Sequence, residues 1–328
     1  MGRKMRHMLI FLLIILKEPN MQEAGCGLKI CTFGKHGLRS IPQNYQNKKT
    51  IEFMNLNHNN IKMIPSGIFN NLPKLEKLLL VSNKITKIQP GAFANVPRLE
   101  ELRLENNQIT KIQAGTFANV PKLQKLNLEN NKITKIEAGT FVNLPVLERL
   151  ILCLNVITMV QPGAFANVPR LQHLSLHDNQ ITKIQAGEFA NLPWVEYLLL
   201  QKNQIKVIQP GAFANLHQLK YLHLHYNQIK MIKSETFANL PQLQLLNLSH
   251  NQITNIHSGA FENVPLFQTL DLQNNNMSSI PLSGLGLFIS IITIKIDGNP
   301  WQCDCRMTPF RLNLAFNEQI VCTQTRQS

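Results

Sequence analysis

The sequence has no apolar run long enough to cross a bilayer. The run from Met8 to Leu16 has nine apolar residues, whereas a membrane-spanning helix needs about 20. No second apolar segment reaches spanning length, and no tail of the lipid-anchor type follows. We therefore expect no transmembrane segment in this chain.

Acidic residues are also scarce. The 328 residues include 19 Asp and Glu against 33 Lys and Arg, which gives a formal net charge of +14. Such a charge permits attraction to anionic glycans, phospholipid surfaces or nucleic acid, but it says nothing about fold. No recognised nucleic-acid-binding motif accompanies it, so nucleic acid is not an expected partner.

Catalytic motifs are absent as well. No serine, cysteine or carboxylate constellation has the pattern that nucleophilic or acid–base catalysis requires. The sequence therefore predicts a protein that is not an enzyme and that needs no cofactor.

The N-terminus has the pattern of a secretory signal peptide. Arg3, Lys4 and Arg6 precede the apolar run, as the charged and hydrophobic regions of a signal peptide do. Residues 1–25 are predicted to be this peptide, with cleavage near Ala24 or Gly25. The protein is accordingly expected to be secreted.

Cysteine is almost confined to the two ends of the chain. The six cysteines are Cys26, Cys31, Cys153, Cys303, Cys305 and Cys322. In a secreted chain, terminal clustering of this kind predicts caps that are stapled by disulfides. Cys153, the exception in the interior, is predicted to be unpaired.

What the sequence does contain is a 24-residue repeat. Asparagine recurs at an unbroken spacing of 24, at Asn59, Asn83, Asn107, Asn131, Asn155, Asn179, Asn203, Asn227, Asn251, Asn275 and Asn299. An LxxLxL frame precedes each one, as in Leu99, Leu102 and Leu104. A second column consists of Phe69, Phe93, Phe117, Phe141, Phe165, Phe189, Phe213, Phe237 and Phe261.

The columns predict a stack of short parallel strands. The LxL alternation places apolar side chains on one face of a strand, and each repeat adds one strand at about 4.8 Å from the last. Buried asparagine amides can satisfy the backbone groups of adjacent turns, and the phenylalanines can fill the wider side as a spine. We assign these columns a structural role.

Residues 51–299 resemble extracellular leucine-rich repeats of the 24-residue type. The resemblance implies an α/β repeat solenoid: a horseshoe with a concave parallel β-sheet and a convex side of loops and short helical or 3-10 turns. It divides the chain into an N-terminal cysteine cap (26–50), ten repeats (51–290) and a C-terminal cap (291–328). The nearest class is the variable-lymphocyte-receptor-like proteins.

The segments GLRSIP (37–42) and NPWQCDC (299–305) resemble the ends of the two caps of that family. By the family pattern Cys303 pairs with Cys322. Cys305 then lacks a partner, which leaves two alternatives, a truncated C-terminal cap or a free Cys305. Truncation is the favoured one.

Two copies of the repeat indicate where function lies. Residues 89–115 and 161–187 differ at five of 27 positions. The pairs are Glu100/Gln172, Glu101/His173, Arg103/Ser175, Glu105/His177 and Asn106/Asp178. All five are positions that a strand turns away from its core. Because exposed residues on the flanks did not change, the pattern favours a recognition surface over neutral drift.

The candidate ligand-binding residues all belong to this concave face. They are Arg103, Ile151, Leu154, His173, His177, Tyr197, Leu199, Tyr221, His223, His225 and Tyr226. Three of the four tyrosines fall within two adjacent repeats, and Tyr is enriched in interface hot spots. The sequence thus predicts a secreted or cell-surface recognition protein of innate or antigen-receptor-like immunity. Its expected partner is a protein or glycan ligand, including microbial surfaces.

Several alternatives accompany this prediction. His223 and His225 form an HxH pair of the kind found in zinc sites, but no third ligand is evident, so no metal site is predicted. Basic stripes along the flanks are compatible with a matrix or adhesion scaffold that binds sulfated glycans. A non-binding fragment of a larger receptor is a third possibility. Cys153 is expected to point into the concavity, and Asn247 and Asn276 begin N-glycosylation sequons.

Overall fold

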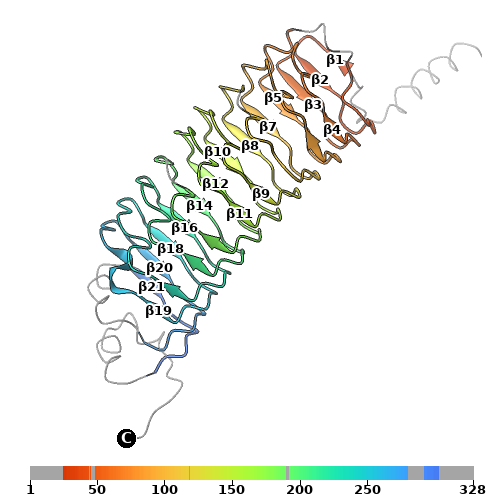
Figure 1. Cartoon of the computed structure of the whole chain (residues 1–328). Coiled ribbons are helices and arrows are strands. Elements are labelled where there is room, and N and C mark those ends of the chain that lie inside the picture. Colours follow the sequence, from red (N-terminus) through yellow and green to blue (C-terminus); the bar gives the residue numbers. More distant parts are fainter. Residues whose placement is uncertain are drawn as a thin grey trace, which may run out of the picture.

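The computed structural model describes residues 25–43, 45, 49–117, 119–189, 192–279 and 292–302. Within these ranges the chain forms one elongated solenoid, which runs from the N-terminal cap to the last repeats (Figure 1). Residues 1–24 of the predicted signal peptide and the cysteines Cys303, Cys305 and Cys322 lie outside the described residues, while Gly25 begins β1. The predicted domain boundaries remain predictions.

One sheet of 13 strands extends along the solenoid. Its strands, in spatial order, are β1 (Gly25–Cys26), β2 (Ile30–Thr32), β3 (Phe53–Asn55), β5 (Lys77–Leu79), β7 (Glu101–Arg103), β8 (Lys125–Asn127), β10 (Arg149–Ile151), β12 (His173–Ser175), β14 (Tyr197–Leu199), β16 (Tyr221–His223), β18 (Leu245–Asn247), β20 (Thr269–Asp271) and β21 (Thr293–Lys295). Only the β1–β2 pair is antiparallel.

The register of this sheet follows the repeat length. From β3 to β21 each residue pairs with the residue 24 positions later, as Leu102 does with Leu126. In β7 the central Leu102 is buried, while Glu101 and Arg103 face solvent partly or fully. The side chains of one sequence column therefore lie side by side across the sheet, and alternate columns line its solvent face.

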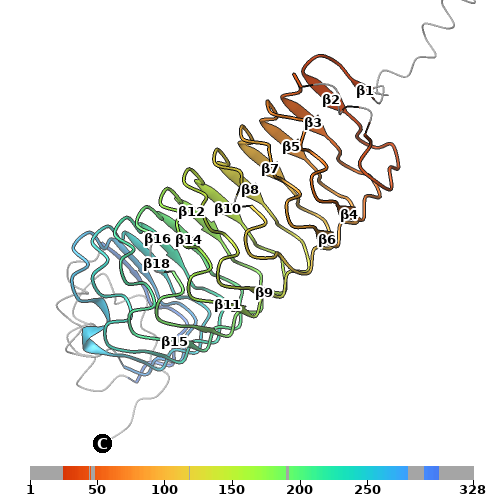
Figure 2. The same cartoon turned by 45° about the horizontal axis from the view of Figure 1, so that its top comes forward.

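The opposite side of the solenoid is built from turns and two-residue strands. The short parallel pairs are β4 (Met63–Ile64) with β6 (Lys87–Ile88), β9 (Lys135–Ile136) with β11 (Met159–Val160), β13 (Lys183–Ile184) with β15 (Val207–Ile208), and β17 (Met231–Ile232) with β19 (Asn255–Ile256). Figure 2 shows β4, β6, β9, β11 and β15 along this side. The one helix among the described residues is the 3-10 turn η1 (Ser258–Phe261). The predicted parallel-sheet solenoid is confirmed.

The asparagine column forms a hydrogen-bonded ladder inside the turns. The Asn107 Nδ2 donates to the carbonyl of Leu80 in the preceding repeat at 2.9 Å and to that of Leu104 at 3.0 Å. Its Oδ1 accepts from the backbone N–H of Ile85 at 3.0 Å. The same pattern recurs at every ladder position to Asn299, where the acceptors are Leu272 and Ile296. Each buried amide thus satisfies backbone groups of two repeats.

The phenylalanine column forms a continuous spine. Neighbouring rings from Phe69 to Phe261 stack with their centroids 5.6 to 6.4 Å apart. The rings are almost completely inaccessible to solvent. Since each ring packs only on its neighbours in adjacent repeats, the core is continuous along the solenoid and depends on the stacking of repeats.

The N-terminal end of the core is closed by a small cap. Cys26 and Cys31 form a disulfide between the antiparallel β1 and β2. Tyr45 is fully buried against the first repeat, and its hydroxyl donates to the carbonyl of Ile68 at 2.9 Å. None of the helices in the described ranges has the length and apolarity needed to cross a membrane.

One buried carboxylate interrupts this core. Glu188 precedes the spine residue Phe189 and is 2% exposed. The corresponding position is alanine in four other repeats and threonine in three. Among the threonines, the hydroxyl of Thr140 donates to the Glu137 carbonyl at 2.7 Å. The Glu188 Oε2 is buried and has no hydrogen-bond partner in the described structure. Burial raises the pKa of Glu188 to about 7.

We expect Glu188→Thr to stabilise the protein in a pH-dependent manner. Because the pKa of Glu188 is higher in the folded state than in the unfolded state, folding favours the protonated form, and stability falls as pH rises from about 4.5 to about 7. The Glu188→Thr variant has no carboxyl group at this position, so its stability does not show this fall with pH. Its advantage in the free energy of unfolding should be small at acidic pH and reach about 3 kcal/mol above neutrality, at 1.36 kcal/mol per pKa unit.

Chemical denaturation at several pH values, with Thr140→Ser as a conservative control, measures this difference. A Glu188→Thr advantage that is the same at every pH would contradict the pKa argument.

Candidate ligand-binding face

The first residue of successive strands forms one row across the concave sheet. The register places Lys125, Arg149, His173, Tyr197 and Tyr221 side by side, on β8, β10, β12, β14 and β16. Each residue precedes a central leucine that points into the core. The fold therefore gathers two cations and three aromatic rings on one strip of the surface.

The rings of this row stack on one another. The centroids of His173 and Tyr197 are 5.9 Å apart, and those of Tyr197 and Tyr221 are 4.7 Å apart with planes inclined by 14°. Tyr197 is 39% exposed. Both faces of the Tyr197 ring are therefore covered by neighbouring rings. The ring edge and the hydroxyl are the parts of Tyr197 that a ligand can contact. The hydroxyl of Tyr221 lies 3.4 Å from the Oε1 of Gln244.

A second aromatic group adjoins the row at the carboxyl ends of the strands. The rings of Tyr226 and His250 stack with centroids 4.2 Å apart. Tyr226 also meets His225 edge-on at 5.6 Å, and His225 meets His223 at 5.7 Å. Because Tyr221 and His223 are on the same strand face, the two groups form one surface, which we call the aromatic face.

Three histidines of the aromatic face, His173, His223 and His225, have pKa values that are lowered and favour their neutral form. Burial lowers the pKa of His173, and the nearby Arg149 acts in the same direction. Burial also lowers the pKa of His223. The pKa of His225 is lowered to about 4, chiefly by burial, and Lys202 acts in the same direction. At neutral pH these side chains therefore act as polar aromatic contacts.

Some residues of this face occupy a strained backbone position. In every repeat the residue before the ladder asparagine has a positive φ; the residues are His58, Ser82, Asn106, Asn130, Leu154, Asp178, Lys202, Tyr226, His250, Asn274 and Gly298. Asn, Asp and Gly adopt this left-handed region at low cost, whereas Leu154 (φ 54°) and Tyr226 (φ 55°) adopt it at a higher cost. Both are also exposed, at 45% and 49%. Neither backbone preference nor burial explains them.

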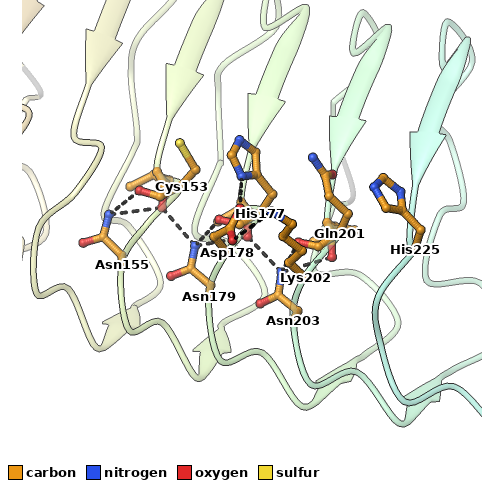
Figure 3. Close-up of polar contacts among 12 residues, drawn as sticks. Cys153, Asn155, His177, Asp178, Asn179, Gln201, Lys202, Asn203 and His225 are labelled. Carbon is orange, nitrogen blue, oxygen red and sulfur yellow. Dashed lines mark hydrogen bonds and ion pairs between the residues drawn. The ribbon is translucent and has the colours of Figure 1, made fainter. Parts of the chain in front are cut away.

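Cys153 is covered by its neighbours on the concave sheet. Cys153 belongs to the column that also contains His177, Gln201 and His225 (Figure 3), but it is only 4% exposed and therefore presents no thiol to the concavity. Its thiol is free. Burial, reinforced by Glu129, raises its pKa to about 11, so the reactive thiolate is disfavoured.

The other predicted residues have varied surroundings. Arg103 is exposed and its Nε donates to the buried Glu105 at 2.7 Å. His177 lies 2.7 Å from the Asp178 carboxylate through its Nδ1. Ile151 and Leu199 are partly buried on β10 and β14. These residues border the aromatic face and do not extend its stacks.

Three residues of the face were not among the sequence candidates: Lys125, Arg149 and His250. Arg149 and Lys125 lie one and two repeats before His173 in the same column, so the 24-residue spacing could have found them. His250 could have been found in the same way, because it follows Tyr226 by 24 residues. A hollow of about 370 Å³ lies between the cations and Tyr197, and Glu148, Gln172 and His173 complete its lining.

The His223–His225 pair has no third metal-ligating side chain beside it among the described residues. In the part of the chain that the structure describes, no three His, Cys, Asp or Glu side chains are grouped so that they could hold a metal ion. His223 and His225 instead contact each other edge-on and join the aromatic face.

The sequon at Asn247 also lies on this sheet. Asn247 is on β18, and its Oδ1 accepts hydrogen bonds from the backbone and hydroxyl of Ser249, the third residue of the sequon. Asn276 is exposed in the following repeat. A glycan on Asn247 would cover the C-terminal part of the sheet and confine binding to the repeats before it.

We expect protein secreted from eukaryotic cells to carry this glycan. Enzymatic deglycosylation followed by peptide mass analysis should convert Asn247 to Asp, and Asn247→Gln should remove the modification. Recovery of the Asn247 peptide only in its unmodified form would reject the glycan.

We also expect Leu154→Asn to stabilise the fold by about 1 kcal/mol, because Asn adopts positive φ at lower cost than Leu. The matched control is Asn130→Leu, the reverse exchange one repeat earlier, which should lower stability. The measurement is the midpoint of urea unfolding. A lower midpoint for Leu154→Asn would show that the Leu154 side chain stabilises the fold.

Comparisons with known proteins agree with this architecture. The leucine rich repeat family model matches residues 50–109, 97–152, 145–205, 193–253 and 246–299. A search of curated protein sequences finds no match.

Similar solved structures include a chain of the octameric complex of Latrophilin 3, Unc5D and FLRT2, where FLRT2 is the leucine-rich-repeat component. That chain is 24% identical in sequence, the match covers 92% of this chain and 93% of that one, and the TM-score is 0.75. Internalin InlF from Listeria monocytogenes has 24% identity, covers 92% and 88%, and has a TM-score of 0.56. The plant peptide hormone receptor RGFR1 in complex with RGF2 has 23% identity, covers 80% and 46%, and has a TM-score of 0.60.

At these identities the structures show a shared fold, while the family model spans most of the chain. Proteins of this family are typically non-enzymatic binding scaffolds, and no catalytic family is indicated. The chain therefore belongs to the leucine-rich-repeat family, whose domains are typical of protein-binding recognition in receptor ectodomains and adhesion proteins.

Proposed function

We propose that this protein is an extracellular recognition protein that binds its ligand on the aromatic face. The observation that carries the proposal is the combination of exposure and strain at Leu154 and Tyr226, beside the half-exposed Tyr197. Strained backbone positions cluster at ligand-binding sites, and contiguous exposed apolar patches mark interaction surfaces. Large aromatic side chains are also typical of interface hot spots.

The surroundings of these residues favour rigid docking. The strands beneath the face are paired on both sides, and the ladder asparagines bind adjacent repeats together. The stacked rings restrict one another further. Binding on such a surface requires little ordering of side chains, so more of the contact energy appears as affinity.

The family and the chemistry of the face support a protein ligand. The similar receptor RGFR1 is in complex with RGF2, a peptide hormone partner, and the similar FLRT2-containing assembly joins several proteins. A protein ligand agrees with these cases. The resemblance to variable-lymphocyte-receptor-like proteins supports a role in immune recognition, including recognition of microbial surfaces. The predicted signal peptide supports secretion.

An adhesion or matrix scaffold is the second candidate. Lys87, Lys135 and Lys183 are exposed on the two-residue strands opposite the main sheet, where they could hold sulfated glycan. Such binding would be mainly electrostatic and would weaken strongly with moderate salt. Binding by the aromatic face would be less sensitive to salt, because much of its contact area is apolar.

We expect the triple variant Tyr197→Ala, Tyr221→Ala and Tyr226→Ala to weaken ligand binding at least about tenfold, since truncation of a hot-spot residue removes 2 kcal/mol or more. The ligand is first identified by screening the secreted protein against glycan arrays, bacterial surfaces and panels of secreted proteins. Affinity is then measured by surface plasmon resonance.

The matched control is Trp194→Ala, Val207→Ala and Met231→Ala. These side chains are 53%, 45% and 51% exposed but lie off the concave strands. Unchanged affinity of the tyrosine variant, or equal loss in both variants, would exclude the aromatic face. Binding that survives the tyrosine changes and disappears with moderate salt would favour the scaffold.

A further inference from the structure

Two cations on the concave sheet have no ionic partner. Most charges there are compensated: Lys77 lies 3.4 Å from Glu101, and Lys220 lies 3.0 Å from Glu196. Lys125 and Arg149 are exposed on β8 and β10, and across the described residues neither takes part in an ion pair. Their adjacent strands place two positive charges side by side.

Lys125 and Arg149 line one end of a hollow in the concave sheet. The space of about 370 Å³ is bounded by Lys125 and Arg149 on one side and by His173 and Tyr197 on the other. Gln172 and Glu148 complete its lining, and Glu148 is the one carboxylate among these six residues. Two unpaired cations and one partly exposed carboxylate leave the hollow with a net positive charge.

The aromatic side of the hollow has the same electrostatic preference. Both faces of Tyr197 are covered, by His173 and Tyr221, so the ring presents its edge and its hydroxyl. The edge of an aromatic ring is the positive part of its quadrupole, and the hydroxyl can donate a hydrogen bond. The row of cations, ring edges and hydroxyls is therefore complementary to carboxylates.

The covered faces also distinguish between ligand classes. A sugar ring binds tyrosine chiefly through an open ring face, and Tyr197 has none. Tyr226, which lies outside the hollow, has one face against His250. Aspartate and glutamate side chains need cations and donors, and Arg149 can pair with a carboxylate through two parallel hydrogen bonds. The geometry favours a peptide carboxylate over a sugar.

We propose that the hollow between Lys125, Arg149 and Tyr197 binds an acidic segment of a protein ligand, with Asp or Glu side chains on the two cations. The proposal rests on the function proposed above and specifies its ligand chemistry. The apolar contacts of Leu154 and Tyr226 then flank the charged site and supply affinity that salt does not screen.

The test uses fluorescent deca-glutamate as the probe, with deca-glutamine and a heparin oligosaccharide as comparisons. Anisotropy is measured at roughly 0.1 M salt, where charges are screened beyond about 10 Å. Lys125→Gln with Arg149→Gln should weaken deca-glutamate binding about tenfold, as expected for loss of both charges of a local site. Glu148→Gln should strengthen it about two- to threefold, since it removes a like charge from the hollow.

The matched control is Lys87→Gln with Lys135→Gln. Both lysines are exposed on the opposite side of the solenoid, and the variant has the same net charge as the concave one. It should change deca-glutamate affinity by less than about twofold, because a screened distant charge contributes little. Circular dichroism verifies that each variant is folded.

Several outcomes would overturn the proposal. They are equal loss in the two double variants, undetectable binding of deca-glutamate at millimolar concentration, and a preference for heparin that depends on Lys125 and Arg149. The last would make the ligand an acidic glycan.

The test also separates this proposal from the function on which it rests. If the ligand found by screening needs the three tyrosines but is indifferent to Lys125 and Arg149, the acidic-segment proposal fails and the aromatic face stands. If ligand binding needs neither the three tyrosines nor the two cations, both the acidic-segment proposal and the proposed binding face fail.

Discussion

The structure depends on the hydrogen bonds of one buried amide per repeat. At each turn the ladder asparagine joins the carbonyl of its own repeat to a carbonyl and an N–H of the repeat before it, as Asn203 does with Leu176, Leu200 and Ile181. Without it, the chain leaving each strand would bury unpaired backbone groups, which is costly. Because the amide must recur at the same place in every turn, the repeat length is uniform, and the strands stack without a slip in register.

Uniform register turns the sequence into columns with separate roles. Leucine, asparagine and phenylalanine columns are buried and hardly vary, whereas the concave columns can change without disturbing what lies beneath. That separation explains how residues 89–115 and 161–187 differ only on the face. It also explains why His173, Tyr197 and Tyr221 stack so closely: adjacent parallel strands hold them one rung apart. A binding surface can thus be altered one residue at a time.

Several residues of the concave face lower the local stability of the fold. Leu154 and Tyr226 adopt a left-handed backbone that Asn106 and Asn130 adopt with less strain, and Lys125 and Arg149 bring two like charges close together. Glu188 is a different case, because it lies in the core away from the concave sheet. The concave examples share one surface and have a common explanation in ligand contact, whereas nothing in the structure gives Glu188 such a role.

The sequence by itself determined the repeat, the concave face and the roles of its buried columns, because a strict period of 24 can be read from single residues such as Asn107 and Phe117. It also placed Tyr197, Tyr221 and Tyr226 on one face. Tertiary structure decided what periodicity does not contain: that Cys153 is covered, that both faces of Tyr197 are occupied, and that Lys125 and Arg149 lack partners. Those properties depend on how neighbouring side chains share space and charge across strands 24 residues apart.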